Sequence, residues 1–565
     1  MRPEPGKPNK TNRLDYETYR YYRWEVENTL NYSKSVGGHN IGAMLSTTAN
    51  QQRRRDFNVS AQGFNNETTA FQYLNWGDSQ KVFVGDAYTE PDNNVSVVGR
   101  ASYSFNDRYF ATASLRRDNA GRLPKDKKHG DFPAVTAAWK LTSVPYMPKS
   151  DIFSLIKLRA SWGRIGNIGS VPFHYGDPTF VVESSNDVGG QVGSNTPLVP
   201  SMVYNGEAFN RYLTWETSEQ LDFGIDLELL KNRLNLSVDF FNKTTKDLIK
   251  RQDTGWPSYI GPEPMYINQG EVKNRGWEFS AGWNDKVGDV NYYINANFAT
   301  LKNWVSDIGP ADPQTGKKPV WIEDDEFRGL NPFRTRENDP LYSFWVYKTD
   351  GLFQSDAEAE AYVNKEGKRM QAKAKAGDIK FVDTNGDGVI NDDDREYVGS
   401  YTPKITYALT AGLTWKNLSA SIMLQGVGGL KAFNAMKYVT LNESMVNFNR
   451  STDILKAWPN SNEVPRLTSS DDNGNFSNIS DFYIEDASYM RIKNITVSYN
   501  FDKIFRSISP RLDERKSSLS VSASVDNIHT FTNYSGTNPE VGGKGLDGGK
   551  YPVPRVFSVG VKLTY

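Results

Sequence analysis

The residues of this chain that are best suited to chemistry form one acidic, glycine-containing segment. Its order D-x-N-x-D-G, with Ile390 two positions after Gly388, follows the spacing of a calcium-binding loop. Calcium takes about six to eight oxygen ligands, and alternate side chains can converge on one cation where a glycine makes a sharp turn. The predicted ligands are Asp383, Asn385, Asp387, the backbone carbonyl of Val389, and Asp394.

The twelfth position of this segment departs from the calcium-loop pattern. It holds Asp394, whose side chain is shorter than the usual bidentate glutamate, and Asp392 or Asp393 could replace it or lie in solvent. The alternative is an acidic turn that is held by its own Asx hydrogen bonds and binds no metal. A calcium ion here would be a structural cofactor that orders the long loop 302–403. A surface helix is predicted just before it, at 356–376, which is rich in Ala, Glu and Lys.

Catalytic motifs are not visible in the sequence. It contains no nucleophile elbow, P-loop or dinucleotide fingerprint, it has no cysteine, and its four histidines are scattered. The 66 basic and 67 acidic side chains leave a formal charge of −1, which argues against a nucleic-acid partner. We therefore predict no catalytic residues and no enzymatic activity.

Aromatic and basic residues in the polar segments are candidates for ligand contacts. Four tryptophans could stack on sugar rings or could pack within loops: Trp256, Trp321, Trp345 and Trp458. The pair Arg116–Arg117 and the lysine-rich segment 125–128 could meet lipid phosphates or could lie in solvent. These patterns do not identify substrate-binding residues.

Period-two alternation of apolar and polar residues recurs along the chain and predicts β-strands with one apolar face. The last segment is the clearest case, with apolar or aromatic side chains at Phe557, Val559, Val561, Leu563 and Tyr565. Similar rows begin at Leu234, Trp277, Val290 and Ile405. These rows are about ten residues long, which suits a tilted strand that crosses a bilayer. No stretch approaches the roughly 18 consecutive apolar residues of a membrane-spanning helix.

Short and long connections alternate along the predicted strands. The short turns are 106–107, 231–232, 284–289 and 416–417, and the long segments, rich in Gly, Asn, Asp, Ser and Pro, are 164–212, 302–403, 428–488 and 529–554. This parity is typical of outer-membrane barrels, which have short periplasmic turns and long extracellular loops. We therefore predict an all-β fold, a large transmembrane antiparallel β-barrel. Residues 351–403 are predicted as an extracellular loop with a short helix and the calcium-like segment.

The alternation predicts about fifteen strands. They lie near 23–32, 39–49, 95–105, 108–117, 133–141, 155–163, 213–229, 234–242, 272–284, 290–301, 404–416, 418–427, 489–501, 518–528 and 555–565. Single-chain bacterial barrels have an even number of strands. The odd number, with the first strand starting outside the membrane, predicts that earlier strands are not in this chain and that it does not close into a barrel by itself.

Several motifs, in the order in which they occur, resemble one known family. They are VGRASYSFNDRY at 98–109, ASLRRD at 113–118, LTWET at 213–217, DFFNKTTKDL at 239–248, IEDASYMRIKNITVSY at 484–499, SVDNIHTF at 524–531 and YPVPR at 551–555. Together they resemble the barrel of SusC/RagA-type TonB-linked outer-membrane proteins. Residues 1–565 as a whole resemble the C-terminal part of that barrel.

The resemblance implies a function as well as a fold. Members of this family are 22-stranded barrels, so this chain would supply about fifteen of the strands in the outer membrane of a Gram-negative, Bacteroidetes-like cell. It implies TonB-dependent import of glycans or peptides, with a SusD-like surface lipoprotein as partner. Coupling to TonB–ExbB–ExbD would use an N-terminal part that is not recognisable here. The alternatives are a soluble or surface carbohydrate-binding protein or adhesin, and a passive porin.

Overall fold

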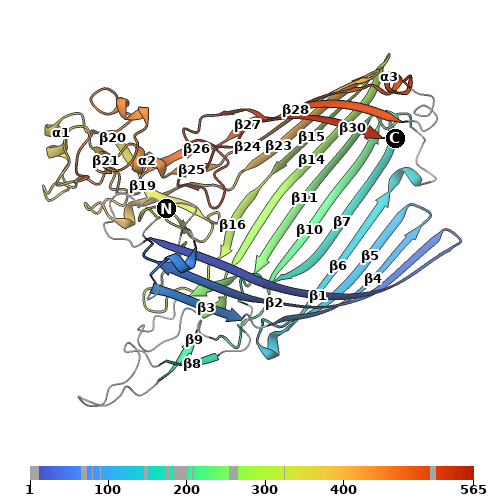
Figure 1. The fold of residues 1–565 in the computed structure, drawn as a ribbon, viewed down its shortest axis with the longest axis horizontal. Helices are drawn as coiled ribbons and strands as arrows, with labels where there is room; N and C mark the ends of the chain where they lie inside the picture. Colours follow the sequence, from blue (N-terminus) through green and yellow to red (C-terminus); the bar gives the residue numbers. More distant parts are fainter. Residues whose placement is uncertain are drawn as a thin grey trace. The chain divides into compact units, whose positions relative to one another are not determined.

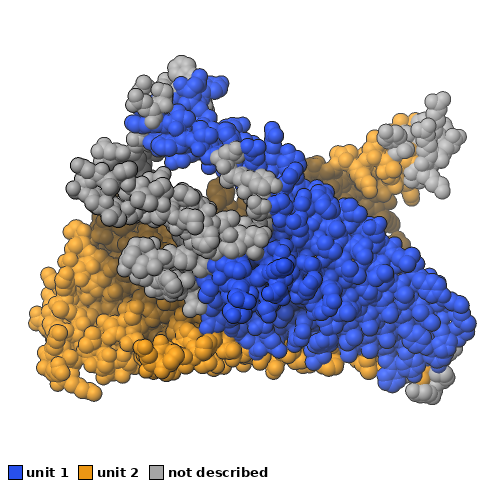
Figure 2. Space-filling view, turned by 90° about the horizontal axis from the view of Figure 1, so that it is seen from below, with its two compact units in different colours: residues 1–139, 159–221, 243–271 blue, residues 140–158, 222–242, 272–565 orange. Residues whose placement is uncertain are grey.

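The computed structural model describes most of the chain. The described residues are 12–64, 73–78, 81–88, 91–144, 150–172, 175, 179–183, 201–205, 209–252, 265–323, 325–508 and 517–564. Trp256 and Tyr565, which the sequence analysis singles out, lie outside them. The chain divides into two compact units, which Figure 2 colours separately. The first comprises Met1–Trp139, Arg159–Leu221 and Lys243–Glu271, and the second comprises Lys140–Leu158, Asp222–Asn242 and Val272–Tyr565.

The first unit is built on long antiparallel strands (Figure 1). They are β1 (Arg13–Val36), β2 (His39–Gln62), β3 (Val82–Tyr88), β4 (Asp92–Phe105), β5 (Tyr109–Ala120) and β6 (His129–Lys140). Strand β2 pairs with β1, with β4 and, at its far end, with β3, while β5 lies between β4 and β6. Buried aliphatic and aromatic residues in and beside the strand ends form a hydrophobic core in this unit, among them Leu213 and Trp215 just before β10.

Three strands run through both units, and each pairs with its neighbour along the sheet. They are β7 (Phe153–Asn167), β10 (Glu216–Leu229) and β11 (Leu234–Lys246). Strand β7 pairs directly with β10. The long connection between them carries the short strands β8 (Thr179–Glu183) and β9 (Ser201–Asn205), which pair with each other, and β11 is followed by the hairpin of β12 (Ile249–Gln252) and β13 (Met265–Asn268).

The second unit continues the antiparallel pattern. Its strands are β14 (Glu271–Val287), β15 (Val290–Thr300), β16 (Lys302–Asp307), β23 (Ile405–Trp415), β24 (Leu418–Gly428), β27 (Tyr489–Asn500), β28 (Ser518–Thr532) and β30 (Val556–Thr564). Pairing follows chain order from β14 through β15, β23, β24, β27 and β28 to β30, and β16 pairs with β14. Seventeen strands are joined in one hydrogen-bonded sheet.

The predicted strands are confirmed one by one. Each of the fifteen predicted segments overlaps one strand of the sheet, and β3 and β16 are the two additional members. Strands β1 and β2 are each 24 residues long, so the prediction found less than half of each. The turn predicted at 284–289 is shorter than expected, because β14 continues to Val287 and β15 begins at Val290. Within the described residues, no helix is both long enough and apolar enough to span a membrane.

Register separates the side chains of the sheet into an apolar and a polar face. On the apolar face, Phe279 lies opposite Phe298 and remains 41% exposed, while Phe298 is 40% exposed. Further along, Val561 of β30 is 68% exposed. On the other face, Ser280 lies opposite Asn297. An apolar face that stays open over many strands is stable against lipid hydrocarbon and not against water.

The long connections of the second unit form a folded structure that we call the loop assembly, residues 308–403, 429–488 and 533–555. Its elements are β17 (Trp321–Ile322), β18 (Arg334–Thr335), β19 (Ser343–Tyr347), β20 (Thr349–Leu352), α1 (Asp356–Ala361), β21 (Ile379–Phe381), β22 (Arg395–Ser400), β25 (Lys431–Asn434), α2 (Met436–Thr440), β26 (Ile484–Asp486) and β29 (Leu546–Asp547). Strand β25 pairs with β26 and, in parallel, with β29, which joins two connections. Their shared core is Leu330, Phe333, Phe344, Val346, Phe433, Ala435, Ile479 and Tyr483.

The helix predicted at 356–376 is wrong in length. Helix α1 begins after Ser355, whose side chain accepts a hydrogen bond from the backbone N–H of Glu358, and it ends at Ala361. The chain then turns at Asn364, whose side-chain oxygen accepts hydrogen bonds from the backbone N–H groups of Glu366 and Lys368. Asparagine side chains compete with helical hydrogen bonds in this way, so the Ala- and Lys-rich composition does not decide the local structure.

Because the two faces of β15 differ in polarity, we expect an arginine to destabilise the protein on one face and to be tolerated on the other. Ile294→Arg should destabilise the assembled protein by about 2–4 kcal/mol, because it places a guanidinium against hydrocarbon. Asn295→Arg, one residue along and on the polar face, is the matched control and should assemble like the wild type. The fraction that stays folded in detergent, read from heat-modifiable gel mobility, checks both variants. Equal damage from both would contradict the assignment of a lipid-facing side and favour a sandwich.

Candidate functional site

The predicted calcium segment is a loop closed by hydrogen bonds to its own backbone. The carboxylate of Asp383 accepts hydrogen bonds from the N–H groups of Gly386, at 2.7 Å, and Gly388, at 2.8 Å. The carboxylate of Asp387 accepts from the N–H of Val389 at 2.8 Å, and the side-chain oxygen of Asn385 accepts from the N–H of Asp387 at 2.8 Å. The first three predicted ligands therefore lie around one turn, with Gly388 at φ 84° as the turn requires.

Asp394 does not sit as a twelfth calcium ligand would. Its side chain is buried, and its oxygens accept hydrogen bonds from the backbone N–H groups of Thr384, at 2.9 Å, and Asn391, at 2.8 Å. It thereby ties the two ends of the loop together. Neighbouring Asp392 pairs with Arg334 at 2.8 Å. Within the described residues, no three His, Cys, Asp or Glu side chains are placed to hold a metal ion, so calcium at this loop stays a prediction.

The tryptophans that could have contacted sugars pack within the loop assembly. Trp321 is 7% exposed. The ring of Trp345 lies under the guanidinium of Arg336, with 3.7 Å from its central carbon to the ring centroid. Trp458 packs beside Gly377, where any Cβ would lie 2.6 Å from its ring. These three side chains stabilise the assembly.

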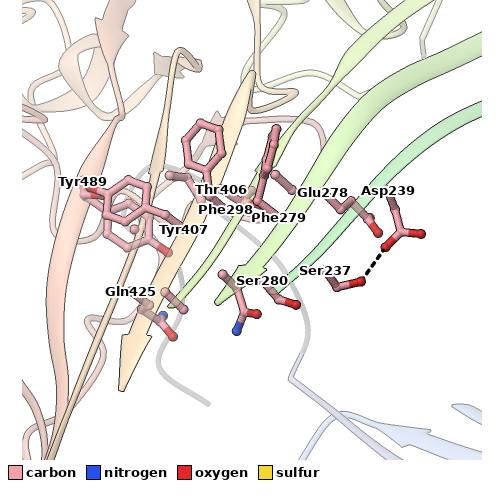
Figure 3. A pocket seen from close by; sticks show the side chains of 15 residues that line it. Ser237, Asp239, Glu278, Phe279, Ser280, Phe298, Thr406, Tyr407, Gln425 and Tyr489 are labelled. Carbon is pink, nitrogen blue, oxygen red and sulfur yellow. Dashed lines mark hydrogen bonds between the residues drawn. The ribbon is translucent and has the colours of Figure 1, made fainter. Parts of the chain in front are cut away.

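The polar face of the second unit carries a cavity of about 530 Å³ (Figure 3). Register explains how it forms, because Ser280, Asn297, Ala408 and Gln425 lie opposite one another across four successive strands. Small Ala408 sits between longer polar side chains and leaves space beside them. Further polar side chains of the lining are Ser237, Asp239, Glu278, Thr406, Tyr407 and Tyr489, and Phe279 and Phe298 are also among the lining residues.

The chemistry of this cavity suits the binding of a polar solute. Its polar side chains are hydroxyls, amides and two carboxylates, and Ser237 donates a hydrogen bond to Asp226 at 2.8 Å. Mixed donors and acceptors of this kind match the hydroxyl groups of a sugar or the amide groups of a peptide. We call this cavity the polar-face pocket.

A buried arginine fixes one wall of the polar-face pocket. Arg491 lies opposite Gln425, and only 2% of its side chain is exposed. Its guanidinium donates to Thr530 at 2.7 Å, to Asn538 at 2.9 Å and to the carboxylate of Glu540. The hydroxyl of Tyr489, a wall residue, donates to the same carboxylate at 2.6 Å. The final connection of the loop assembly is thus bound to β27 beside the pocket.

The ionised form of Glu540 is favoured by this arrangement. Burial alone would raise the pKa of the Glu540 carboxyl, but hydrogen bonds from Tyr489 and Arg491, together with the charge of Arg491, hold the pKa below its ordinary value. A carboxyl with a lowered pKa stabilises the folded state above its unfolded pKa of about 4.3, and this stabilisation is lost as the pH falls through the folded pKa.

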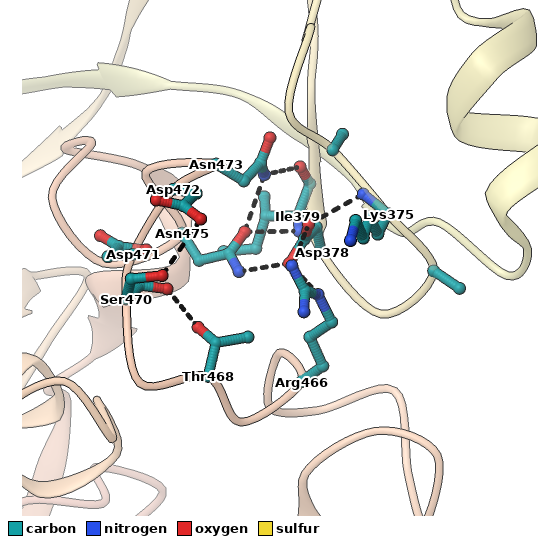
Figure 4. Close-up of polar contacts among 12 residues, drawn as sticks. Lys375, Asp378, Ile379, Arg466, Thr468, Ser470, Asp471, Asp472, Asn473 and Asn475 are labelled. Atoms are coloured by element: carbon teal, nitrogen blue, oxygen red, sulfur yellow. Dashed lines mark hydrogen bonds and ion pairs between the residues drawn. The ribbon is translucent and has the colours of Figure 1, made fainter.

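A second buried ion pair holds two connections of the loop assembly together (Figure 4). Asp378 is fully buried, and Arg466 donates to both of its oxygens, at 2.7 and 3.1 Å. Asn475 donates to Asp378 at 2.8 Å, and its own oxygen accepts from the N–H of Ile379 at 2.9 Å. The segments that contain residues 378 and 466–475 are therefore locked side by side.

Sequence reasoning identified the segment that contains Arg491 but not its role. The partner Glu540 lies 49 residues further along the chain, and no local pattern links the two. The polar-face pocket was also missed, because it arises from register between strands that are far apart in sequence. Arg491 stands in an alternating strand, and a charged residue at such a position would need a partner if it were buried, which is the signal that could have been used.

Comparison with known proteins relates this geometry to one family. Residues 3–528 match the family described as TonB dependent receptor-like, beta-barrel. TonB-dependent receptor P3 of Formosa agariphila is 28% identical over 557 residues, which cover 95% of this chain and 52% of that protein. TonB-dependent receptor SusC of Bacteroides thetaiotaomicron is 25% identical over 563 residues, which cover 96% of this chain and 51% of that protein. The chain therefore spans about half the length of these relatives.

Solved structures show the same fold. The RagAB peptide importer in its open-open state superposes with a TM-score of 0.79 at 21% sequence identity, over 99% of this chain and 57% of that one. The RagAB peptide transporter superposes with a TM-score of 0.76 at the same identity. The predicted all-β barrel fold is thus confirmed.

The Arg491 cluster generates a prediction about acid sensitivity. Glu540→Gln should loosen the connection 533–555 by about 2 kcal/mol, less than the roughly 3–5 kcal/mol of a fully buried pair, because the side chain of Glu540 is 38% exposed. Wild-type protein should show the same loosening when the pH falls below about 4, whereas Glu540→Gln should be loose at every pH. The rate of limited proteolysis between residues 533 and 555 measures how firmly this connection is held.

A matched control separates this effect from a general loss of charge. Glu396→Gln removes an exposed carboxylate of β22 and should leave the cleavage pattern unchanged. If Glu540→Gln were also unchanged at neutral pH, the ion pair would not hold the connection.

The calcium prediction is tested on the loop itself. If the loop binds calcium, the double variant Asp383→Ala, Asp387→Ala should be cleaved more readily by protease between residues 350 and 400. Millimolar calcium should protect the wild type but not this variant. Extracellular calcium sites bind with a Kd of about 10⁻⁴ to 10⁻³ M, so millimolar calcium is sufficient. Glu366→Ala, in a neighbouring turn, is the control. Identical cleavage of the wild type in calcium and in chelator would leave the segment as an Asx-bonded turn.

Proposed function

The chain belongs to the TonB dependent receptor-like β-barrel family. We therefore propose that it forms part of the barrel wall of a TonB-dependent importer of glycans or peptides. Its resemblance to SusC/RagA-type proteins is confirmed by a relative named SusC and by the fold of RagAB. The protein is accordingly one of the outer membrane. The relatives are receptors and transporters, and we propose no enzymatic step for this chain.

The observation that carries the proposal is the polar-face pocket on a sheet whose other face is apolar and open. In this arrangement lipid contacts one face while a polar solute can bind to the other. The pocket offers hydroxyl, amide and carboxylate groups from six strands, β11, β14, β15, β23, β24 and β27. A hydrated sugar or peptide could exchange its water for these groups during passage.

The partners follow from the same family and remain part of the proposal. A SusD-like surface lipoprotein would meet the loop assembly, which is a packed structure with its own core. Energy would come from TonB–ExbB–ExbD through a part of the protein outside these residues. The peptide alternative is supported by the RagAB importer, whose name states a peptide substrate. The glycan alternative rests on the SusC resemblance.

Uptake measurements test the proposal. Cells that express the protein should accumulate a labelled oligosaccharide or oligopeptide, and deletion of tonB should abolish the accumulation. Gln425→Ala combined with Asn297→Ala should lower uptake about tenfold, which corresponds to about 1.4 kcal/mol of lost binding.

Asn295→Ala is the control for the pocket variant, because this side chain lies on the same face of β15 but does not line the cavity. It should leave uptake unchanged. Uptake that continues at full rate without TonB would contradict the proposal and favour a passive porin.

A further inference from the structure

A second cavity, of about 570 Å³, lies where the chain leaves β15 and returns to β23. Its lining side chains include three lysines, Lys302, Lys404 and Lys431, and two aromatic residues, Trp304 and Tyr397. The carboxylate among its lining residues is Asp486. The wall is therefore cationic and aromatic, unlike that of the polar-face pocket. We call it the lysine cavity.

Lys302 and Lys404 are available to a ligand, whereas Lys431 lies opposite Asp486 across the β25–β26 pair. In the described part of the chain, none of them forms an ion pair with a carboxylate. Other lysines of the loop assembly do form such pairs, as Lys544 shows by pairing with Glu323 at 2.6 Å. Asp486 offsets one of the three positive charges, and the excess that is left would be lowered in energy by an anion in the cavity.

Two glycines make room for the lysine side chains. Gly399 has a φ of 132°, and a Cβ there would lie 2.8 Å from Cγ of Lys431. Gly429 has a φ of 72°, and a Cβ there would lie 3.0 Å from Cβ of Lys404. Both stems pack directly against backbone that only glycine readily supplies. The positions of these cations are therefore determined by the fold and not by chance at a free surface.

The aromatic wall reaches the apolar face of the sheet. The ring of Trp304 lies 5.3 Å from the ammonium of Lys302 and 5.8 Å from the guanidinium carbon of Arg275. Arg275 is two residues from Trp277 on β14 and so shares its face. Trp277 in turn packs against Phe240 at 5.0 Å between ring centroids. The lysine cavity thus adjoins an aromatic row of the lipid-facing side.

The distance along β14 places this cavity at the membrane surface. A tilted strand rises about 3.3 Å per residue and is inclined by about 40° to the membrane normal. The part of β14 between Arg275 and the turn after Val287 therefore covers roughly 30 Å along that normal. That length is about the thickness of the hydrocarbon layer. The long connections lie at this end of the strand, which is the extracellular end in barrels of this type. The lysine cavity is therefore at the level of outer-leaflet headgroups.

We propose that the lysine cavity binds the phosphorylated sugar headgroup of an outer-leaflet lipid. Lysine ammonium groups bind phosphate as point charges, and basic pockets at the membrane surface recognise anionic headgroups. The rings of Trp304 and Tyr397 can pack against the apolar face of the sugar. The role goes beyond the proposed import, since it concerns how the barrel wall is held by its lipid, whatever the imported substrate.

Lipid binding to the protein purified from outer membranes tests the proposal. The probes are bisphosphorylated lipid A, the same lipid after removal of its phosphates, and soluble glucosamine 1-phosphate, each followed by native mass spectrometry. The wild type should retain the bisphosphorylated lipid at least tenfold better than the other two probes. The combined variant Lys302→Ala, Lys404→Ala and Lys431→Ala should lose this preference.

A matched variant controls for the loss of three charges. Lys317→Ala, Lys365→Ala and Lys368→Ala removes exposed lysines of the loop assembly and should bind lipid like the wild type. Heat-modifiable mobility shows whether each variant is folded, and Lys404→Ala alone serves if the triple variant does not assemble. The proposal would be overturned if the triple variant retained the bisphosphorylated lipid like the wild type, or if the wild type retained the lipid equally well without its phosphates. Equal binding of soluble glucosamine 1-phosphate would overturn the lipid source and assign the cavity to a soluble anion.

Discussion

The hydrogen bonding of the backbone is the constraint on which the rest of this structure depends. In hydrocarbon, an unsatisfied N–H or C=O group costs several kcal/mol, so each strand needs a partner along its length. The ladder from β14 to β30 meets this requirement strand by strand. Within the described residues, β1 and β30 each pair on one side only. Once the ladder is formed, period-two alternation sends one set of side chains to lipid and the other to the polar face, and the polar-face pocket follows from that division.

Charged groups determine where the long connections fold onto this ladder. Arg491 and Asp378 are almost completely buried, and each is paired and hydrogen-bonded by side chains from distant segments. Such pairs are weak sources of net stability, because desolvation offsets much of their attraction, but removing one partner is costly. They therefore select one arrangement of the loop assembly among many. The arrangement matters because Tyr489 is held by the Arg491 cluster and also lines the polar-face pocket.

The strands could be predicted from the sequence because alternation is a local property. The errors occur where polar residues obscure it, as in the first part of β1, where Arg20 interrupts the row of Tyr16, Tyr22 and Trp24. The loop assembly could not be predicted, since its contacts join separate connections: the N–H of Tyr347 donates to the carbonyl of Ile479 at 2.8 Å, and Phe433 pairs with Leu546. The calcium-like segment shows the limit of a motif. Its first three positions lie around one turn, whereas Asp394 is used to close the loop.

Alternate residues of one strand face lipid and water, and β15 allows this division to be measured directly. The chain has no cysteine, so single cysteines at 292 to 298 can each carry a spin label without background. Collision rates with oxygen, which concentrates in lipid, and with a water-soluble nickel chelate then report the surroundings of each position. We predict high oxygen collision at 292, 294, 296 and 298 and high nickel collision at 293, 295 and 297. Equal nickel collision at both sets would contradict the account.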